Sequence, residues 1–269
     1  MRALLIGDIV GRPGRVAVSR FVVGLREELG IDLVVANCEN AAGGAGITPT
    51  VAEELFGAGV DVLTSGNHVW RKKEAYELLR LDHRVLRPAN YAAGAPGTGS
   101  VVIETLSGQK AGILNLQGRV FMPDLVDCPF RAAEVEVQRL RLSTPVVIVD
   151  MHAEATSEKV ALGWFLDGKV SCIFGTHTHI QTADERILPN GTAFLTDVGM
   201  TGPYDSVIGR KTDQILERFL SGLPVKSEVA EGNIQLRGLL VDVDVKTGKA
   251  THVERLTRSL TERVTSAER

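Results

Sequence analysis

The chain has 269 residues, of which 44% are hydrophobic, so it is long enough to bury a full core. A formal net charge of −3 at pH 7 leaves no basic footprint, which argues against strong general binding to nucleic acid. No stretch approaches the roughly 20 apolar residues of a membrane span, and the apolar run at the N-terminus is too short for a signal peptide. Its three cysteines form no CxxC pair and are expected to be reduced, so we expect a cytoplasmic protein.

The first 70 residues alternate short apolar runs with helical patterns. Strands are predicted at 2–6, 31–36 and 60–64, and helices at 14–29 and from 49 to 57 or 59. Thr48 followed by Pro49 is typical of a helix start, and Gly30 is typical of a helix end. Strands separated in this way by helices favour parallel pairing with right-handed crossovers.

The rest of the chain continues the alternation less regularly. Helices are predicted at 72–81, 130–142 and 158–166, and strands at 100–106, 110–116, 145–149, 170–174 and 192–196, with a final hairpin of 237–245 and 250–256. No linker or repeat interrupts the sequence, so we predict a single domain over residues 1–269. Its strands are expected to form a mixed sheet or two packed sheets. The polar segment 260–269 is expected to fray.

Polar side chains of metal-binding types follow the ends of five of these strands. They are Asp8, then Glu39 with Asn40, then Asn67 with His68, then His152, and last His177 with His179. Each has an ordinary alternative alone, such as a helix cap, a solvated loop acid, a turn residue or a buried histidine bonded to backbone. Together they favour one site at the carboxyl edge of a sheet.

This donor set indicates the kind of metal site. Carboxylate and amide oxygens mixed with imidazoles suit Mn, Fe or Zn, and the absence of a cysteine cluster argues against a structural zinc site. Several neutral nitrogen ligands favour Fe or Mn over Mg. Because about eight donors exceed the needs of one ion, we predict a centre with two metal ions about 3.5–4 Å apart.

Four sequence strings are more specific than the donor types. They are GDIVGRPG from residue 7, NCENAAGG from residue 37, TSGNHVW from residue 64 and GTHTHIQT from residue 175. These strings resemble the calcineurin-like metallophosphoesterases and, more narrowly, the YmdB-like bacterial phosphodiesterases, over nearly the whole chain. The resemblance implies a four-layer αββα sandwich of the metallophosphoesterase type, with a dimetal site at the strand ends.

Two departures from the wider superfamily support the narrower resemblance. Asp8 is followed by Ile9 and Val10, whereas the usual first motif is Asp-x-His. Glu39 replaces the usual bridging Asp, and the adjacent Asn40 is placed to supply the missing donor. The YmdB-like subgroup shares both changes.

The resemblance also implies a role for each residue. One metal ion would be held by Asp8, Asn40 and His179, the other by Asn67, His152 and His177, with Glu39 bridging the two. A hydroxide bridging the ions would attack phosphorus, and His68 would protonate the leaving oxygen as general acid. The alternative role for His68 is to support a neighbouring metal ligand by a hydrogen bond. Apart from the resemblance, the Gly43–Gly44 loop would let the backbone approach phosphate, and Arg12 could offer it a guanidinium, with an exposed arginine at a helix start as the alternative for Arg12.

The activity that the resemblance implies is hydrolysis of 2′,3′-cyclic nucleotides to monophosphates, in preference to phosphomonoesters and 3′,5′-cyclic nucleotides. A phosphomonoesterase and a non-enzymatic regulator that senses nucleotide or metal remain alternatives, because both would use the same ligands. A His-x-His amidohydrolase is disfavoured because its histidine pair would lie on the first barrel strand. A structural metalloprotein is disfavoured because His68 is uncommitted. We expect a small nucleotide substrate, no membrane partner and a homo-oligomer.

Overall fold

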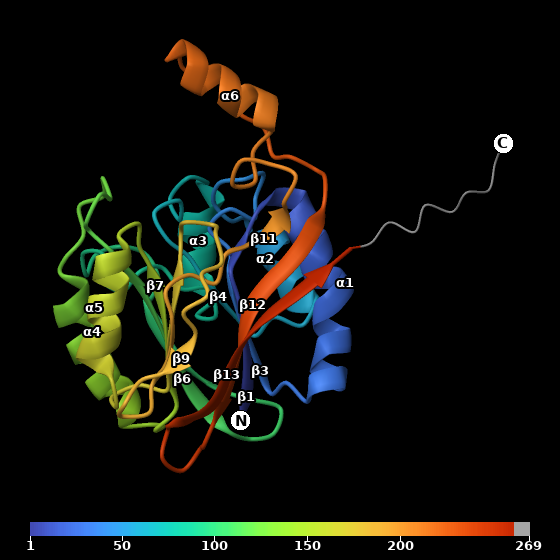
Figure 1. Cartoon of the computed structure of the whole chain (residues 1–269). Coiled ribbons are helices and arrows are strands. Elements are labelled where there is room, and N and C mark those ends of the chain that lie inside the picture. Colours follow the sequence, from blue (N-terminus) through green and yellow to red (C-terminus); the bar gives the residue numbers. More distant parts are fainter. Residues whose placement is uncertain (261–269) are drawn as a thin grey trace.

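The computed structural model describes residues 1–260, which form two packed β-sheets (Figure 1). The first sheet has the order β2-β11-β12-β1-β3-β4, with β13 paired to β12, and the second has the order β5-β6-β7-β8-β10-β9. The strands of the first sheet are β1 (Arg2–Ile6), β2 (Asp8–Ile9), β3 (Leu33–Asn37), β4 (Val62–Thr64), β11 (Met200–Pro203), β12 (Ile234–Val243) and β13 (Ala250–Ser259). Those of the second are β5 (Ser100–Glu104), β6 (Lys110–Gln117), β7 (Val147–His152), β8 (Cys172–Thr176), β9 (Arg186–Ile187) and β10 (Ala193–Leu195). Both sheets mix parallel and antiparallel pairs.

Helices cover the outer face of each sheet. The first sheet is covered by α1 (Gly11–Leu29), α2 (Pro49–Gly57) and α3 (Glu74–Leu81), and the second by α4 (Pro129–Arg141) and α5 (Thr156–Leu166) (Figure 1). Helix α6 (Thr212–Ser221) projects away from the sheets. None of the helices within residues 1–260 has the length and apolar character needed to cross a bilayer.

Side-chain alternation along the strands creates three separate cores. In β1, Leu4 and Ile6 join the core under α1–α3, whereas Leu5 lies between the sheets. In β7, Val149 faces α4 and α5, whereas Ile148 lies between the sheets. Central strands buried on both faces read as unbroken apolar runs, which is why the sequence shows them so clearly. The layers therefore follow the order helices, sheet, sheet, helices.

The predicted elements are present, with differences at their ends. Helix α1 begins at Gly11 rather than 14, β4 begins at Val62 rather than 60, and β7 continues to His152 instead of stopping at 149. The short strands β2, β9 and β11 are not among the predicted elements. Strands of two to four residues carry little periodicity of their own, and β2 exists because Met200 of β11 pairs with Asp8.

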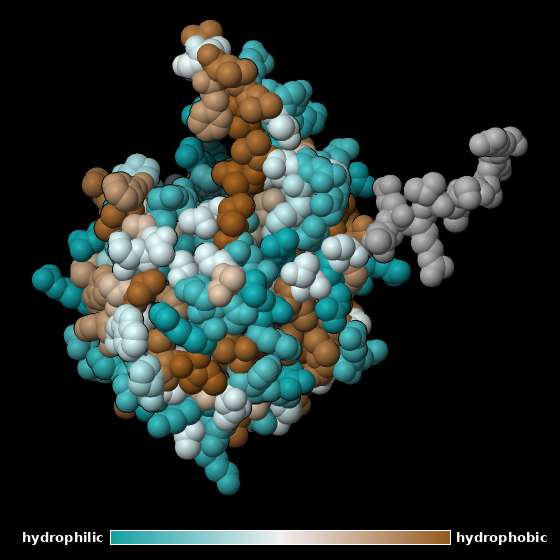
Figure 2. Space-filling model, viewed as in Figure 1, coloured by the Kyte–Doolittle hydropathy of each residue, from teal (hydrophilic) through white to brown (hydrophobic). Residues whose placement is uncertain are grey.

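Helix α6 is also absent from the predicted elements, although its apolar residues have helical spacing. Ile215 is buried, but Phe219 and Leu220 are 79% and 86% exposed. Figure 2 shows an apolar surface over this projecting helix.

The homo-oligomer and the single domain over 1–269 stay predictions. The fraying expected for 260–269 falls on residues beyond 260, outside the described part of the chain.

Candidate metal centre

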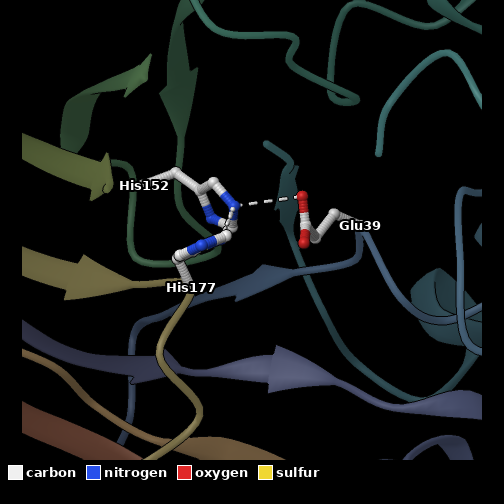
Figure 3. Close-up of side chains that lie close together, drawn as sticks. All are labelled: Glu39, His152 and His177. Atoms are coloured by element: carbon white, nitrogen blue, oxygen red, sulfur yellow. Dashed lines mark hydrogen bonds and ion pairs between the residues drawn. The ribbon is translucent and has the colours of Figure 1, made fainter. Parts of the chain in front are cut away.

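Three predicted ligands converge at the ends of their strands. The side chains of Glu39, His152 and His177 offer ligand atoms that all lie within 4.8 Å of one another (Figure 3). His152 Nε2 lies 3.1 Å from Glu39 Oε2, from His177 Nδ1 and from Asn67 Oδ1. Two oxygens and a second imidazole nitrogen that surround one imidazole nitrogen form the donor set expected for a metal ion.

A second group of donors adjoins the first. Asp8 Oδ2 accepts the backbone N–H of His177 at 3.0 Å, whereas Asp8 Oδ1 is buried without a hydrogen-bond partner among the described residues. This oxygen lies 3.8 Å from His179 Nε2. A buried carboxylate oxygen left unpaired is costly, so the site fits a cation at this position.

Asn40 lies in the same group, 3.2 Å from His179 through its Nδ2 atom. Its Oδ1 atom instead accepts a hydrogen bond from His68 Nδ1–H at 2.7 Å. Ligation of a metal through the amide oxygen therefore requires the Asn40 side-chain amide to turn over.

The tautomer of His152 is set by a hydrogen-bonded chain. His152 Nδ1–H donates to Thr176 Oγ1 at 2.9 Å, and the Thr176 hydroxyl donates to Asp150 Oδ1 at 2.7 Å. Asp150 also accepts hydrogen bonds from Thr64 Oγ1 at 2.5 Å and Asn37 Nδ2 at 3.0 Å, both from the first sheet. The chain leaves Nε2 directed at the donor cluster, as in the outer-shell partners of many metal-bound histidines.

The other two histidines have equivalent partners. His177 Nε2 lies 3.1 Å from Glu154 Oε2, and His179 Nδ1–H donates to the Ile208 carbonyl at 2.9 Å. In each case the remaining ring nitrogen, Nδ1 of His177 and Nε2 of His179, faces the carboxylates. All three imidazoles are thus oriented before any ion binds.

The loop that carries His177 and His179 is anchored by a buried ion pair. Both histidines have positive φ angles, 98° and 67°, a conformation that costs a non-glycine residue about 1–3 kcal/mol. Asp197 Oδ2 accepts hydrogen bonds from the Thr178 backbone N–H and hydroxyl, and it also pairs with Lys159 Nζ at 2.7 Å. Asp197 and Lys159 are each 1% exposed. Their anchoring of Thr178 opposes relaxation of the loop.

Two motif glycines permit this close packing. A Cβ atom at Gly66 would lie 2.1 Å from His152 Cδ2, and one at Gly175 would lie 1.8 Å from the Thr196 carbonyl oxygen. Both separations are far below van der Waals contact, so a side chain at either position would displace the ligands or their strand. The glycines of the third and fourth sequence strings are therefore steric requirements of the site.

The charges in the cluster favour a cation. Burial raises the pKa of Asp8. Burial also acts to raise the pKa of Glu39, but attraction to His152 and hydrogen bonding outweigh it and hold that pKa well below its usual range. Burial opposes a charge on His152, yet Glu39 and Asp8 raise its pKa to about 9. Burial and the adjacent His152 charge lower the pKa of His177 to about 3. The two buried carboxylates thus stabilise a positive charge on His152, at the point where the ligand atoms converge.

A cavity of about 320 Å³ opens in front of these donors and falls within the size range of small-molecule sites. His68 lines it, as do Gly44 and Arg210. Arg12 is exposed at the start of α1, and neither Arg12 nor Gly43 is among the lining residues.

Several residues of the site are not among those selected from the sequence. They are Asp150, Glu154, Lys159, Thr176, Thr178, Asp197, Ile208 and Arg210. Asp150 inside an apolar strand and Lys159 inside an apolar helix are signals that pattern reasoning could have used, because buried charges are rare unless paired. Arg210 offers no such signal, since it lies in a loop 31 positions after His179.

The fold and site together define a mixed α/β protein with a cluster of oxygen and nitrogen donors at the ends of strands from two sheets. Comparison with known sequences narrows this class. The family model described as "YmdB-like protein" matches residues 4–256. The chain is 46% identical over 256 residues to a Bacillus subtilis protein named 2′,3′-cyclic-nucleotide 2′-phosphodiesterase, covering 95% of this chain and 96% of the relative. The chain belongs to the YmdB-like family, as its sequence strings predict.

A further relative and two solved structures are similar to this chain over nearly its whole length. A Mycoplasma genitalium protein named putative phosphatase/phosphodiesterase is 36% identical, with 95% of this chain and 92% of the relative covered. A crystal structure described as a hypothetical protein from Thermus thermophilus is 40% identical, with a TM-score of 0.90 and coverage of 96% and 99%. A structure described as a novel phosphatase from Mycoplasma pneumoniae is 37% identical, with a TM-score of 0.89 and coverage of 96% and 93%. The fold is thus shared along nearly the whole chain.

Proposed function

We propose that this protein is a metal-dependent phosphodiesterase that hydrolyses 2′,3′-cyclic nucleotides. The observation that carries the proposal is the convergence of Glu39, His152 and His177 next to the unpaired Asp8 Oδ1, at a cavity lined by His68. The relative named as a 2′,3′-cyclic-nucleotide 2′-phosphodiesterase supports the choice of substrate. The layered fold is then the αββα sandwich of the metallophosphoesterases.

The donor groups support two ions per chain, with Fe or Mn favoured. Asn67, His152 and His177 would hold one ion, Asp8, Asn40 and His179 the other, and Glu39 would lie between them. Three imidazoles favour borderline transition metals over Mg²⁺. Bound ions at such a site supply Lewis acidity and lower the pKa of water.

His68 is placed to act as the general acid. His68 Nδ1 lies 2.7 Å from the end of the Asn40 amide; with that amide turned over to ligate a metal, Asn40 Nδ2 would donate to Nδ1 and leave the ring proton on Nε2. The backbone N–H of His68 donates to Glu39 Oε2 at 3.1 Å. The side chain is 28% exposed at the cavity, so Nε2 is available to a substrate. Hydrolysis places the hydroxyl of water on phosphorus and a proton on the departing ribose oxygen. His68 would donate that proton from Nε2.

The cavity limits which phosphodiesters can react. Its volume of about 320 Å³ accommodates a mononucleotide, and the net charge of −3 supplies no basic track for a long strand. The phosphate of a 2′,3′-cyclic nucleotide is a strained five-membered diester with a poor alkoxide leaving group, so a positioned acid is valuable.

The three cysteines form no disulfide in the described residues, in keeping with a cytoplasmic location.

A substrate panel tests the proposal. Purified protein loaded with Mn²⁺ or Fe²⁺ would be assayed with 2′,3′-cyclic nucleotides, 3′,5′-cyclic nucleotides and phosphomonoesters at equal concentrations. We expect the highest kcat/KM for the 2′,3′-cyclic class. A preference for monoesters would make the protein a phosphomonoesterase. Absence of turnover on all three would support the non-enzymatic sensor.

A further inference from the structure

The cavity has a second wall, formed by a turn with no metal donor. Backbone hydrogen bonds between Val207 and Arg210, at 2.9 and 3.0 Å, close this turn. Its Ile208 carbonyl accepts the Nδ1–H of His179, and its Arg210 side chain lines the cavity. The turn that orients one metal-binding histidine therefore also brings a guanidinium to the substrate space.

Arg210 lacks a negatively charged partner. Its Nη2 atom donates to the Gly44 carbonyl at 2.5 Å, and it forms no ion pair with any residue in the range 1–260. It is the only lysine or arginine among the cavity-lining residues described. Of the two lining carboxylates, Glu39 belongs to the donor cluster and Glu154 pairs with His177. A half-buried guanidinium without a carboxylate is costly to maintain, and burial lowers its pKa.

The glycine-rich loop makes room for this side chain. Gly44 has a φ of 89°, and a Cβ atom there would lie 2.7 Å from Arg210 Nη1. A residue larger than glycine would push the guanidinium out of its position and would also strain the backbone. The Gly43–Gly44 loop, which is predicted to contact phosphate, therefore also leaves space for the Arg210 side chain.

We propose that Arg210 binds the non-bridging phosphate oxygens of the substrate. This inference rests on the proposed phosphodiesterase function, because it assigns the anionic group of that substrate to a specific side chain. A guanidinium presents several N–H donors in a planar fork that matches phosphate geometry. The phosphate of a diester carries one negative charge, and its non-bridging oxygens gain more as the nucleophile adds, so the contact stabilises the bound substrate and, more strongly, the transition state.

The kinetic consequence is specific. Loss of a hydrogen-bonded charge contact weakens binding by about 10- to 100-fold, so Arg210→Gln should raise KM for a 2′,3′-cyclic nucleotide by that factor. Its kcat should fall as well, because the oxygens that Arg210 contacts gain charge in the transition state. Arg210→Lys keeps the charge without the planar fork of donors, so its KM should lie between those of wild type and Arg210→Gln. The melting temperature of Arg210→Gln should be unchanged or higher, because an uncompensated charge has been removed.

The experiment compares wild type, Arg210→Gln and Arg210→Lys with Arg20→Gln, which removes an exposed arginine on α1. Each metal-loaded protein is assayed for steady-state kinetics and metal content, and titrated calorimetrically with inorganic phosphate. We expect weaker phosphate binding by about 10- to 100-fold in Arg210→Gln and no change in Arg20→Gln. Equal KM values and equal phosphate affinities in Arg210→Gln and Arg20→Gln would refute the inference.

Two further outcomes are decisive. If wild type hydrolyses no cyclic nucleotide, the proposed function fails, but the phosphate titration still tests Arg210. If Arg210→Gln loses metal or unfolds, Arg210→Lys decides: affinity for phosphate equal to that of wild type would show that the fork is not used. A fall in its affinity with metal content retained would support the inference.

Discussion

The two sheets supply different chemistry to the candidate metal centre. The first sheet contributes oxygen donors: Asp8 in β2, Glu39 and Asn40 after β3, and Asn67 after β4. The second contributes only imidazoles: His152 at the end of β7, and His177 and His179 after β8. Neither sheet alone offers the mixed set, so the site exists only where the sheets pack together. A centre divided in this way ties metal binding to the tertiary fold.

The buried carboxylate of Asp150 links the two sheets next to the site. Asp150 of the second sheet accepts hydrogen bonds from Asn37 and Thr64 of the first sheet and from Thr176 of its own. Burial raises the pKa of Asp150 to about 6, and these three hydrogen bonds act in the opposite direction. The same group that orients His152 therefore also holds the sheets in register at the site.

The largest effect should follow removal of one ligand from each sheet. Glu39→Gln removes the central carboxylate of the first sheet, and His177→Ala removes an imidazole of the second. Because each of the two proposed ions would need donors from both sheets, we expect each variant to bind at most one ion and to lose turnover. Metal analysis after reloading checks this, with exposed Glu27→Gln as the control. If either variant keeps two ions, the divided centre is wrong.

His68→Ala should separate rate from metal binding. His68 follows a first-sheet strand as the oxygen donors do, but we assign it to proton donation. We expect full metal content with kcat reduced by roughly 10²–10⁴-fold on cyclic nucleotides. The reduction should shrink on nitrophenyl esters, whose leaving group needs little protonation. Loss of metal equal to that in His177→Ala would instead make His68 a ligand.

A smaller effect should reveal the hydrogen-bonded chain behind His152. Thr176→Val removes the hydroxyl between His152 and Asp150 with almost no change of shape. We expect metal affinity to fall by about 10- to 100-fold, as for other outer-shell partners. Thr64→Val is the matched control, because it also removes a hydrogen bond to Asp150 but leaves the link to His152 intact. Equal losses in competition titrations with a chelator would contradict an orienting role.

The smallest effect should come from Glu154→Gln. Glu154 partners His177 as Thr176 partners His152, but its side chain is 48% exposed, so solvent weakens the interaction. We expect metal affinity to fall by about tenfold or less, at the lower end for such partners. The same chelator titration measures it. A loss larger than that of Thr176→Val would reverse the ranking of buried and exposed partners.

The predicted donors came from one regularity, that polar residues following buried strands meet at a sheet edge. This held for Asp8, Glu39, His152 and His177 because their strands are apolar on both faces and therefore easy to locate. The same regularity could not identify Arg210, because this residue reaches the cavity from a turn that is bonded to His179 and Gly44 and not from a strand end.

Local sequence by itself determined the alternation of strands and helices, the donor types and their place at strand ends, because these depend on periodicity and on nearest neighbours along the chain. The tertiary structure alone decided how the strands divide between two sheets, which nitrogen of each histidine faces the centre, and that Lys159 reaches Asp197 beneath the histidine loop. The contacts that fix the last two features join residues 24, 29 and 38 positions apart. Only packing in three dimensions brings such residues together.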